Sequence, residues 1–172
     1  MLGVRICLLL FLPVLIIACG SEMTRDYDPE LVSRAIESMR SLNSAFDKNI
    51  PAEECKKLLD DVESTVILAI GKTKNTKLND SLRRALEKYQ SSYSLWSRMS
   101  GLSRDIKETE RMSEGYLRIY KRYPSDRVSD KLDEFIEKQK QLEKEYADLQ
   151  RQYKDTLSQA RTEVAIIESI NN

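Results

Sequence analysis

Apolar side chains recur at alternating steps of three and four residues through the C-terminal third of this chain. From about Ser129 onward, nine of the twelve positions in this register are apolar residues or tyrosine: Leu132, Phe135, Gln139, Leu142, Tyr146, Leu149, Tyr153, Thr156, Ala160, Glu163, Ile167 and Ile170. This spacing places one continuous stripe along a helix, as in a coiled coil. It predicts a helix of about forty residues, roughly 60 Å long at 1.5 Å per residue.

Two shorter helices are predicted near the start of the chain. Asp28-Pro29-Glu30 combines an N-cap acid, a proline at the first helical position and an acid in the first turn. The stripe that follows is Leu31, Ala35, Met39, Leu42 and Phe46. Pro51 opens a second helix, which Gly71 is expected to end, with a stripe formed by Cys55, Leu58, Leu59, Val62, Val66, Ala69 and Ile70. Because the C-terminal helix is longer than either, we expect its end to project as an arm or to pair with another copy.

A third helical period begins at about Thr76. Its stripe is Leu78, Leu82, Ala85, Leu86, Tyr89, Tyr93, Trp96 and Met99. Ser100-Gly101 could end or kink this helix, after which the period resumes weakly until Tyr123. Pro124 then stops it, because a residue that precedes proline avoids the helical region. The sequence leaves open whether residues 76–123 form one bent helix or two.

These patterns predict an all-α protein: a three- to four-helix antiparallel bundle, over residues 29–172, with a long coiled-coil-like C-terminal helix. Composition agrees, since 33% of the residues are charged while the whole chain has 5 glycines and 4 prolines, which makes it rich in helix formers. Strand patterns are almost absent. No internal repeat is evident.

The N-terminus has the pattern of an export signal. Arg5 supplies a positive start, Ile6 to Ile17 is almost entirely apolar, and Ala18 precedes Cys19. The apolar run is shorter than the roughly 20 residues that span a bilayer, and it suits a cleavable secretory signal. Ile16-Ile17-Ala18-Cys19 resembles the lipobox of bacterial lipoproteins, a likeness that covers about the first 21 residues. The alternative is an ordinary signal peptide or an uncleaved signal anchor, with Cys19 incidental.

The lipoprotein resemblance implies a location in the cell. Residues 1–18 would be a cleaved signal peptide, Cys19 would be acylated at its thiol, and residues 19–28 would form a polar tether. Two or more acyl chains anchor a protein stably to a membrane. In Gram-negative lipoproteins an aspartate after the cysteine usually marks the inner membrane, whereas this chain has Gly20. The resemblance therefore implies the bacterial cell envelope, and the periplasmic face of the outer membrane if the source is Gram-negative.

The residue inventory offers little for catalysis. The chain has no histidine, which removes the commonest general base and the commonest zinc ligand. Neither a phosphate-binding glycine loop nor a metal-binding cysteine pair is present, so we expect no enzyme, no cofactor and no metal site. The neighbouring acids Glu53-Glu54 and Asp60-Asp61 point about 100° apart on a helix and do not converge. Cys55 is expected to be a small buried hydrophobic residue, or alternatively a reactive thiol.

Charge is distributed in blocks. Residues 19–63 carry 6 Lys/Arg and 11 Asp/Glu, residues 64–128 carry 14 and 7, and residues 129–172 carry 7 and 10. One interpretation is intramolecular, with a basic middle section packed between acidic neighbours. The other is a basic surface for anionic lipid, lipopolysaccharide or an acidic partner. The candidate residues for that surface are Arg118, Lys121, Arg122 and Arg127, which surround three tyrosines. Nucleic acid is not expected as a partner outside the cytoplasm.

An aromatic spacing occurs twice, once within the third stripe and once in the basic section. The two sets are Tyr89, Tyr93 and Trp96, then Tyr116, Tyr120 and Tyr123. Tyrosine and tryptophan have an apolar body with a polar tip, which suits both a half-buried seam and a binding groove. These residues are therefore either bundle core near its edge, or candidates for binding a partner helix, a peptide or a glycan.

Taken together, the sequence predicts a lipid-anchored extracytoplasmic helical protein that acts as a non-catalytic interaction or structural module. Its expected partners are the membrane, through Cys19, and another envelope protein, with a homo-oligomer through residues 132–170 as a further possibility. It is similar in size, anchor and helicity to secretin pilotins, although no motif supports that likeness. The alternative function is binding of anionic lipid, lipopolysaccharide or peptidoglycan through the basic-aromatic section. Capture of a protein partner would require an open apolar groove.

Overall fold

The computed structural model describes residues 26–48 and 50–172, which contain four helices and no strand. The helices are α1 (Pro29–Asp47), α2 (Ala52–Lys72), α3 (Thr76–Arg122) and α4 (Asp126–Asn171). The all-α prediction is confirmed. The predictions for the signal peptide, for Cys19 and for most of the tether lie outside the described residues.

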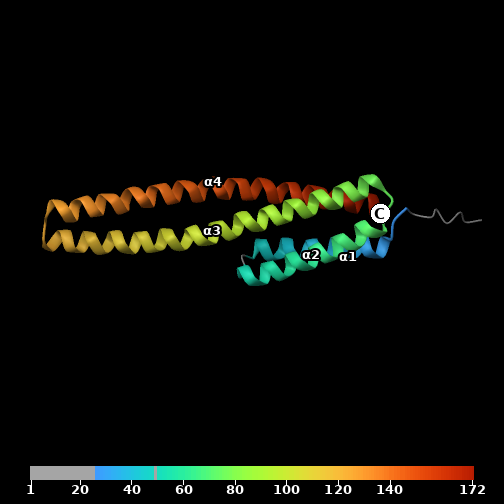
Figure 1. The fold of residues 1–172 in the computed structure, drawn as a ribbon, viewed down its shortest axis with the longest axis horizontal. Coiled ribbons are helices and arrows are strands. Elements are labelled where there is room, and N and C mark those ends of the chain that lie inside the picture. The colour runs from blue at the N-terminus through green and yellow to red at the C-terminus, as the bar shows by residue number, and fades with distance from the viewer. Residues whose placement is uncertain (1–25, 49) are drawn as a thin grey trace, which may run out of the picture.

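The helices form a rod with a thick end and a thin end (Figure 1). At the thick end, here called the base, α1 and α2 pack against the first half of α3 and the last half of α4. Contacts join α1 to α2, α2 to α3, α3 to α4 and α4 back to α1, so all neighbours in this ring are antiparallel. The predicted antiparallel bundle is therefore a four-helix bundle in the base. Beyond the ends of α1 and α2, only the α3–α4 hairpin continues, and this thin part, residues 100–149, is here called the arm.

The part of α4 that projects is its N-terminal half. Its C-terminal end lies in the base beside the start of α1, where the Tyr27 hydroxyl donates to the Ile170 carbonyl at 3.0 Å. Asn171 Nδ2 also donates to Ser33 Oγ at 3.2 Å. The arm becomes possible because α3 is one continuous helix of 47 residues, which runs through Gly101 and matches the 46 residues of α4. The open question of one helix or two is thus answered.

Side-chain caps explain where most of the helices begin. Asp28 accepts from the backbone N–H groups of Glu30 and Leu31 at 3.0 and 3.3 Å, as the sequence predicts. Asn75 caps α3 at Leu78 N–H, and Ser125 caps α4 at Val128 N–H. The Ser125 cap starts α4 at Asp126, three residues before the expected start near Ser129. The predicted stop at Gly71 falls one residue short, because α2 continues to Lys72.

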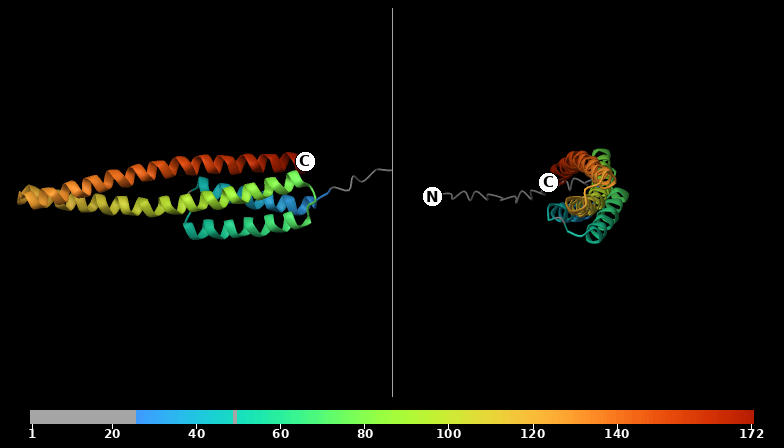
Figure 2. Two further views of the ribbon diagram at one scale, coloured as in Figure 1. Left: turned by 45° about the horizontal axis from the view of Figure 1, so that its top comes forward. Right: turned by 90° about the vertical axis from the view of Figure 1, so that its left-hand side faces the viewer.

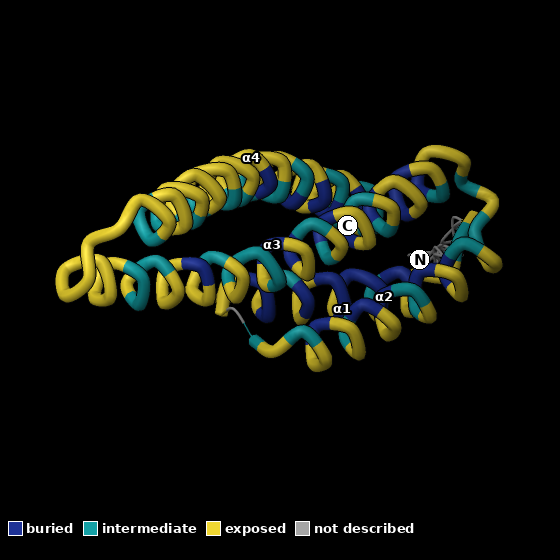
Figure 3. The backbone as a smooth tube through the Cα atoms, turned by 60° about the vertical axis from the view of Figure 1, so that its left-hand side comes forward, coloured by how far each residue is buried: buried dark blue, intermediate teal, exposed yellow. Residues whose placement is uncertain are grey.

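The core lies in the base (Figure 3). Val32, Met39, Leu42, Leu78 and Leu82 are fully buried there. Cys55 is also fully buried, as predicted for a small hydrophobic residue. In the arm the same kinds of side chain are mostly half-buried, because two helices cannot cover each other on every side. The base therefore supplies most of the apolar burial that stabilises the fold.

The predicted C-terminal seam faces inward along its whole length. None of its twelve positions is exposed. They pack against α3 and, in the base, also face the interior of the bundle. The seam that the sequence offers for a homo-oligomer therefore packs against α3, while most of its positions remain half-buried.

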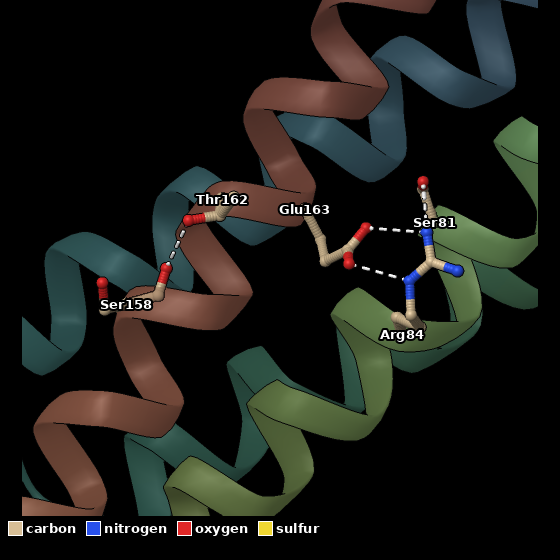
Figure 4. Close-up of polar contacts among 5 residues, drawn as sticks. All are labelled: Ser81, Arg84, Ser158, Thr162 and Glu163. Carbon is tan, nitrogen blue, oxygen red and sulfur yellow. Dashed lines mark hydrogen bonds and ion pairs between the residues drawn. The ribbon is translucent and has the colours of Figure 1, made fainter.

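Ion pairs join the basic third helix to the acidic fourth helix. Arg84 Nε lies 2.7 Å from Glu163 Oε1, and a second guanidinium nitrogen of Arg84 lies 3.2 Å from Glu163 Oε2 and 3.0 Å from Ser81 Oγ (Figure 4). Arg98 and Glu145 make a similar pair at 3.2 Å. These contacts support the intramolecular interpretation of the charge blocks for this part of α3. The Arg98–Glu145 pair is exposed and adds little stability, whereas Glu163 in the Arg84 pair is 17% exposed.

Helices α1 and α4 are joined by further polar contacts. Arg161 lies 2.7 Å from Asp47, and Arg40 lies 2.9 Å from Glu168. Across the residues that the structure describes, none of the helices is both long and apolar enough to cross a membrane.

Candidate functional site

The first aromatic set lies at the end of the base. Tyr89 is fully buried, Trp96 is 8% exposed, and Tyr93 is half-buried. Of the two interpretations, the core one applies to Tyr89, which no partner can reach without unfolding the base. Trp96 lies at the boundary where the base gives way to the arm.

Tyr89 is in an unusual electrostatic environment. Burial raises the pKa of its phenol to about 12, and nearby Asn43 and Arg161 offset this only in part. Although Asn43 lies close, the Tyr89 hydroxyl has no hydrogen bond of good geometry among the described residues. Such a phenol stays protonated at neutral pH and would be a poor general base.

Three aromatic rings close the end of the base. The ring of Phe46, near the end of α1, lies 6.3 Å from Trp96 and 5.9 Å from Tyr153. Tyr153 belongs to the α4 seam, and burial raises the pKa of its phenol to about 12. The three rings therefore connect α1, α3 and α4 at the level where α1 stops.

An open groove of about 510 Å³ lies beside this aromatic cluster. We call it the junction groove. It is lined by Trp96, Met99, Ser100, Ser103, Tyr146, Gln150, Tyr153 and Lys154. Of these residues, sequence reasoning singled out Trp96 alone as a binding candidate. The α4 side was missed, although Tyr146 and Tyr153 are successive aromatic positions of the predicted seam.

The second aromatic set lies at the far end of the arm. Tyr116 is half-buried, and its ring centroid lies 5.3 Å from that of Phe135. Tyr120 and Tyr123 are 36% and 73% exposed. The structure thus separates the second aromatic set into one residue packed against α4, Tyr116, and two surface residues, Tyr120 and Tyr123.

The basic residues of the basic-aromatic section surround Tyr120 and Tyr123. Arg118, Lys121, Arg122 and Arg127 are all exposed, and none makes an ion pair with another described residue. Residues 115–128, here called the tip, contain these four cations and a single acid, Asp126. Leu117 and Ile119 of the tip are 40% and 47% exposed.

The junction groove and the tip are separate surfaces. Trp96 and Tyr123 are 27 positions apart along α3, which corresponds to about 40 Å at 1.5 Å per residue. The candidate residues of the two aromatic sets therefore do not converge on one site.

The described residues hold no group of three or more His, Cys, Asp or Glu side chains that could bind a metal ion. The acids Glu53, Glu54, Asp60 and Asp61 are exposed on α2. Burial raises the pKa of the Cys55 thiol, which makes it less reactive than an ordinary thiol. No family model, curated protein or solved structure matches this chain.

Proposed function

We propose that this protein is a lipid-anchored, extracytoplasmic interaction module of the bacterial cell envelope, without catalytic activity. Acylation of Cys19 would hold it at the membrane, on the periplasmic face of the outer membrane in a Gram-negative cell. The single observation that supports a protein partner is the junction groove, with its volume of about 510 Å³. A role like that of secretin pilotins is one form of this proposal.

The groove lies where a helix of the bundle is missing. In the base, α1 places Phe46 against Trp96 and Tyr153. Beyond Asp47, where α1 ends, the corresponding side of the α3–α4 hairpin lies open at the groove. An amphipathic helix or peptide with an apolar anchor residue could pack on this side of the hairpin, in line with α1 and beyond its end. Tryptophan and tyrosine are common centres of binding energy in protein interfaces, and Trp96, Tyr146 and Tyr153 line this groove beside polar residues.

Photo-crosslinking in native membranes tests the partner. A photoreactive residue at Ser103, which lines the groove, should give a discrete protein adduct. The matched control is Ser94, an exposed serine nine positions earlier and about 180° around the same helix, which should give none. Equal labelling at both positions, or no protein adduct at Ser103, would count against the groove as a docking site.

Metabolic labelling with a fatty acid tests the anchor separately. The label should appear on the wild-type chain and disappear in the Cys19→Ser variant. Retention of the label by that variant would exclude Cys19 as the attachment point.

A second candidate function is binding of an anionic ligand such as lipopolysaccharide, peptidoglycan or lipid through the tip. It is favoured by the exposure of Tyr123, which is 73%, beside the four exposed cations of the tip. Binding of this kind should weaken as salt is raised, because exposed charges are screened over about 10 Å at 0.1 M ionic strength.

A further inference from the structure

The two ends of the rod are far apart, and the chain enters at one of them. The Lys74 backbone N–H donates to the Asp26 carbonyl at 2.6 Å, which pins the entering segment beside the start of α3. From there α3 runs for 47 residues, or about 70 Å, to the tip. Figure 2 shows the hairpin extending away from the base along this axis. A group held near Asp26 is therefore about 70 Å from Tyr123.

The tip combines three kinds of side chain that suit the headgroup region of a bilayer. Tyr120 and Tyr123 have amphipathic rings, which favour the membrane–water interface. Leu117 and Ile119 add aliphatic surface that is 40% and 47% exposed. The four cations, set against Asp126, give residues 115–128 a net charge of +3, which Asp130, Lys131, Asp133 and Glu134 at the same level of α4 reduce to +1 over residues 115–135. Anionic headgroups attract clusters of exposed cations such as the four of the tip.

The size of the tip also argues for a membrane over a protein. Two helices, each about 10 Å across, present an end of roughly 200 Å². A standard protein interface buries about 800 Å² on each partner. A flat protein partner that met the rod end-on would therefore have little surface to bury, whereas partial insertion among lipid headgroups also uses the sides of the two helices.

We propose that the tip binds the surface of an anionic bilayer other than the one that holds the anchor, so that the protein bridges two membranes. This inference rests on the proposed anchoring through Cys19. Cys19 and Asp26 are seven positions apart, which allows a tether of at most about 24 Å. Tyr123 lies in the short link between α3 and α4, at the extreme end of the rod. In an end-on contact its ring would therefore meet the second bilayer directly.

A vesicle-bridging assay tests this proposal with the full processed chain. The protein is reconstituted through its own anchor into neutral phosphatidylcholine vesicles and then mixed with labelled vesicles that contain phosphatidylglycerol. We expect the labelled vesicles to float together with the protein-bearing vesicles, and this association to be lost at high salt. Neutral labelled vesicles should not associate.

A matched pair of double variants tests the role of the tip. Arg118→Gln with Lys121→Gln removes two exposed cations of the tip. Arg104→Gln with Lys107→Gln removes two exposed cations at the same spacing, on the part of α3 in the arm that precedes the tip. Since each cation near an anionic surface contributes about a fivefold change in binding, the tip variant should bind about 25-fold more weakly. The arm variant should bind as the wild type does, and circular dichroism should show equal helicity in both.

Several outcomes would overturn the proposal. One is the absence of bridging by wild-type protein, and another is an equal loss in the two double variants. A protein adduct from a photoreactive residue at Tyr123, without any lipid adduct, would also overturn it. Flotation of the protein with its own neutral vesicles reports the anchor independently: without it, both the anchoring and the bridging proposals fail, whereas anchoring without bridging overturns the bridging alone.

Discussion

Replacement of Phe46 by alanine should destabilise the protein far more than the same replacement of Phe135. Phe46 is 3% exposed and has ring neighbours on α3 and α4, at 6.3 and 5.9 Å. Phe135 is half-buried in the arm, with one ring neighbour at 5.3 Å. The two variants remove the same atoms, so the difference between them measures how unevenly the base and the arm contribute to stability.

The burial difference sets the expected magnitudes. Truncation of a buried phenylalanine to alanine costs about 3–5 kcal/mol, through lost burial and the cavity that remains. The open junction groove beside Phe46 allows some relaxation, so we expect about 4 kcal/mol for Phe46→Ala. Half the burial and a single ring contact predict about 2 kcal/mol for Phe135→Ala. Since a domain is stable by about 5–15 kcal/mol, the first loss is a large share of the total.

Guanidinium unfolding followed by tryptophan fluorescence measures both losses. The chain has a single tryptophan, Trp96, whose ring lies beside that of Phe46, and so the fluorescence reports on the end of the base. Its emission should shift toward that of exposed indole in folded Phe46→Ala and stay unchanged in Phe135→Ala. Phe46→Leu, which retains most of the volume, serves where the alanine variant is too unstable to fold. Equal free-energy losses for the two alanine variants would refute the uneven distribution of stability.

Three other perturbations have outcomes that follow from the described contacts. Because burial raises the phenol pKa of Tyr89 to about 12, above its ordinary value of 10, the unfolded state loses this proton first as pH rises. Stability should therefore fall between about pH 10 and pH 12, and urea-unfolding curves should show a smaller fall for Tyr89→Phe. At pH 7 this variant should cost nothing, since the Tyr89 hydroxyl makes no hydrogen bond of good geometry among the described residues. Gly101→Ala should raise the midpoint of thermal unfolding, with a gain of about 0.5–1 kcal/mol, because Gly101 is helical and an added Cβ meets nothing within 4 Å. Cys55 should react with a thiol reagent only as fast as the base opens, so rapid labelling of native protein at neutral pH would contradict its burial.

Local interactions explain why the positions of the helices could be predicted. Capping by Asp28 and the stop at Pro124 depend on residues only a few positions away. The three- and four-residue steps of the C-terminal seam depend on the helical period alone. Each of these features therefore appears in the structure close to where the sequence predicts it.

The continuity of α3 could not be predicted in this way. Gly101 weakens a helix by about 1 kcal/mol relative to alanine, which on local grounds made a break plausible. Packing against α4 compensates for this cost along the arm. Such contacts join residues far apart in the chain, for example Arg98 and Glu145, and no local pattern reveals them.

The two aromatic sets show most clearly what the sequence determines and what the tertiary structure determines. The sequence by itself determined that Tyr89 and Tyr123 belong to two aromatic sets with the same helical spacing, because side-chain direction follows from the period. Only the tertiary structure decided that Tyr89 is fully buried while Tyr123 is 73% exposed. The physical reason is that α1 and α2, with 19 and 21 residues, cover only the part of α3 that lies in the base. Burial depends on which helices reach a given level of the rod, and that is a property of the assembled bundle.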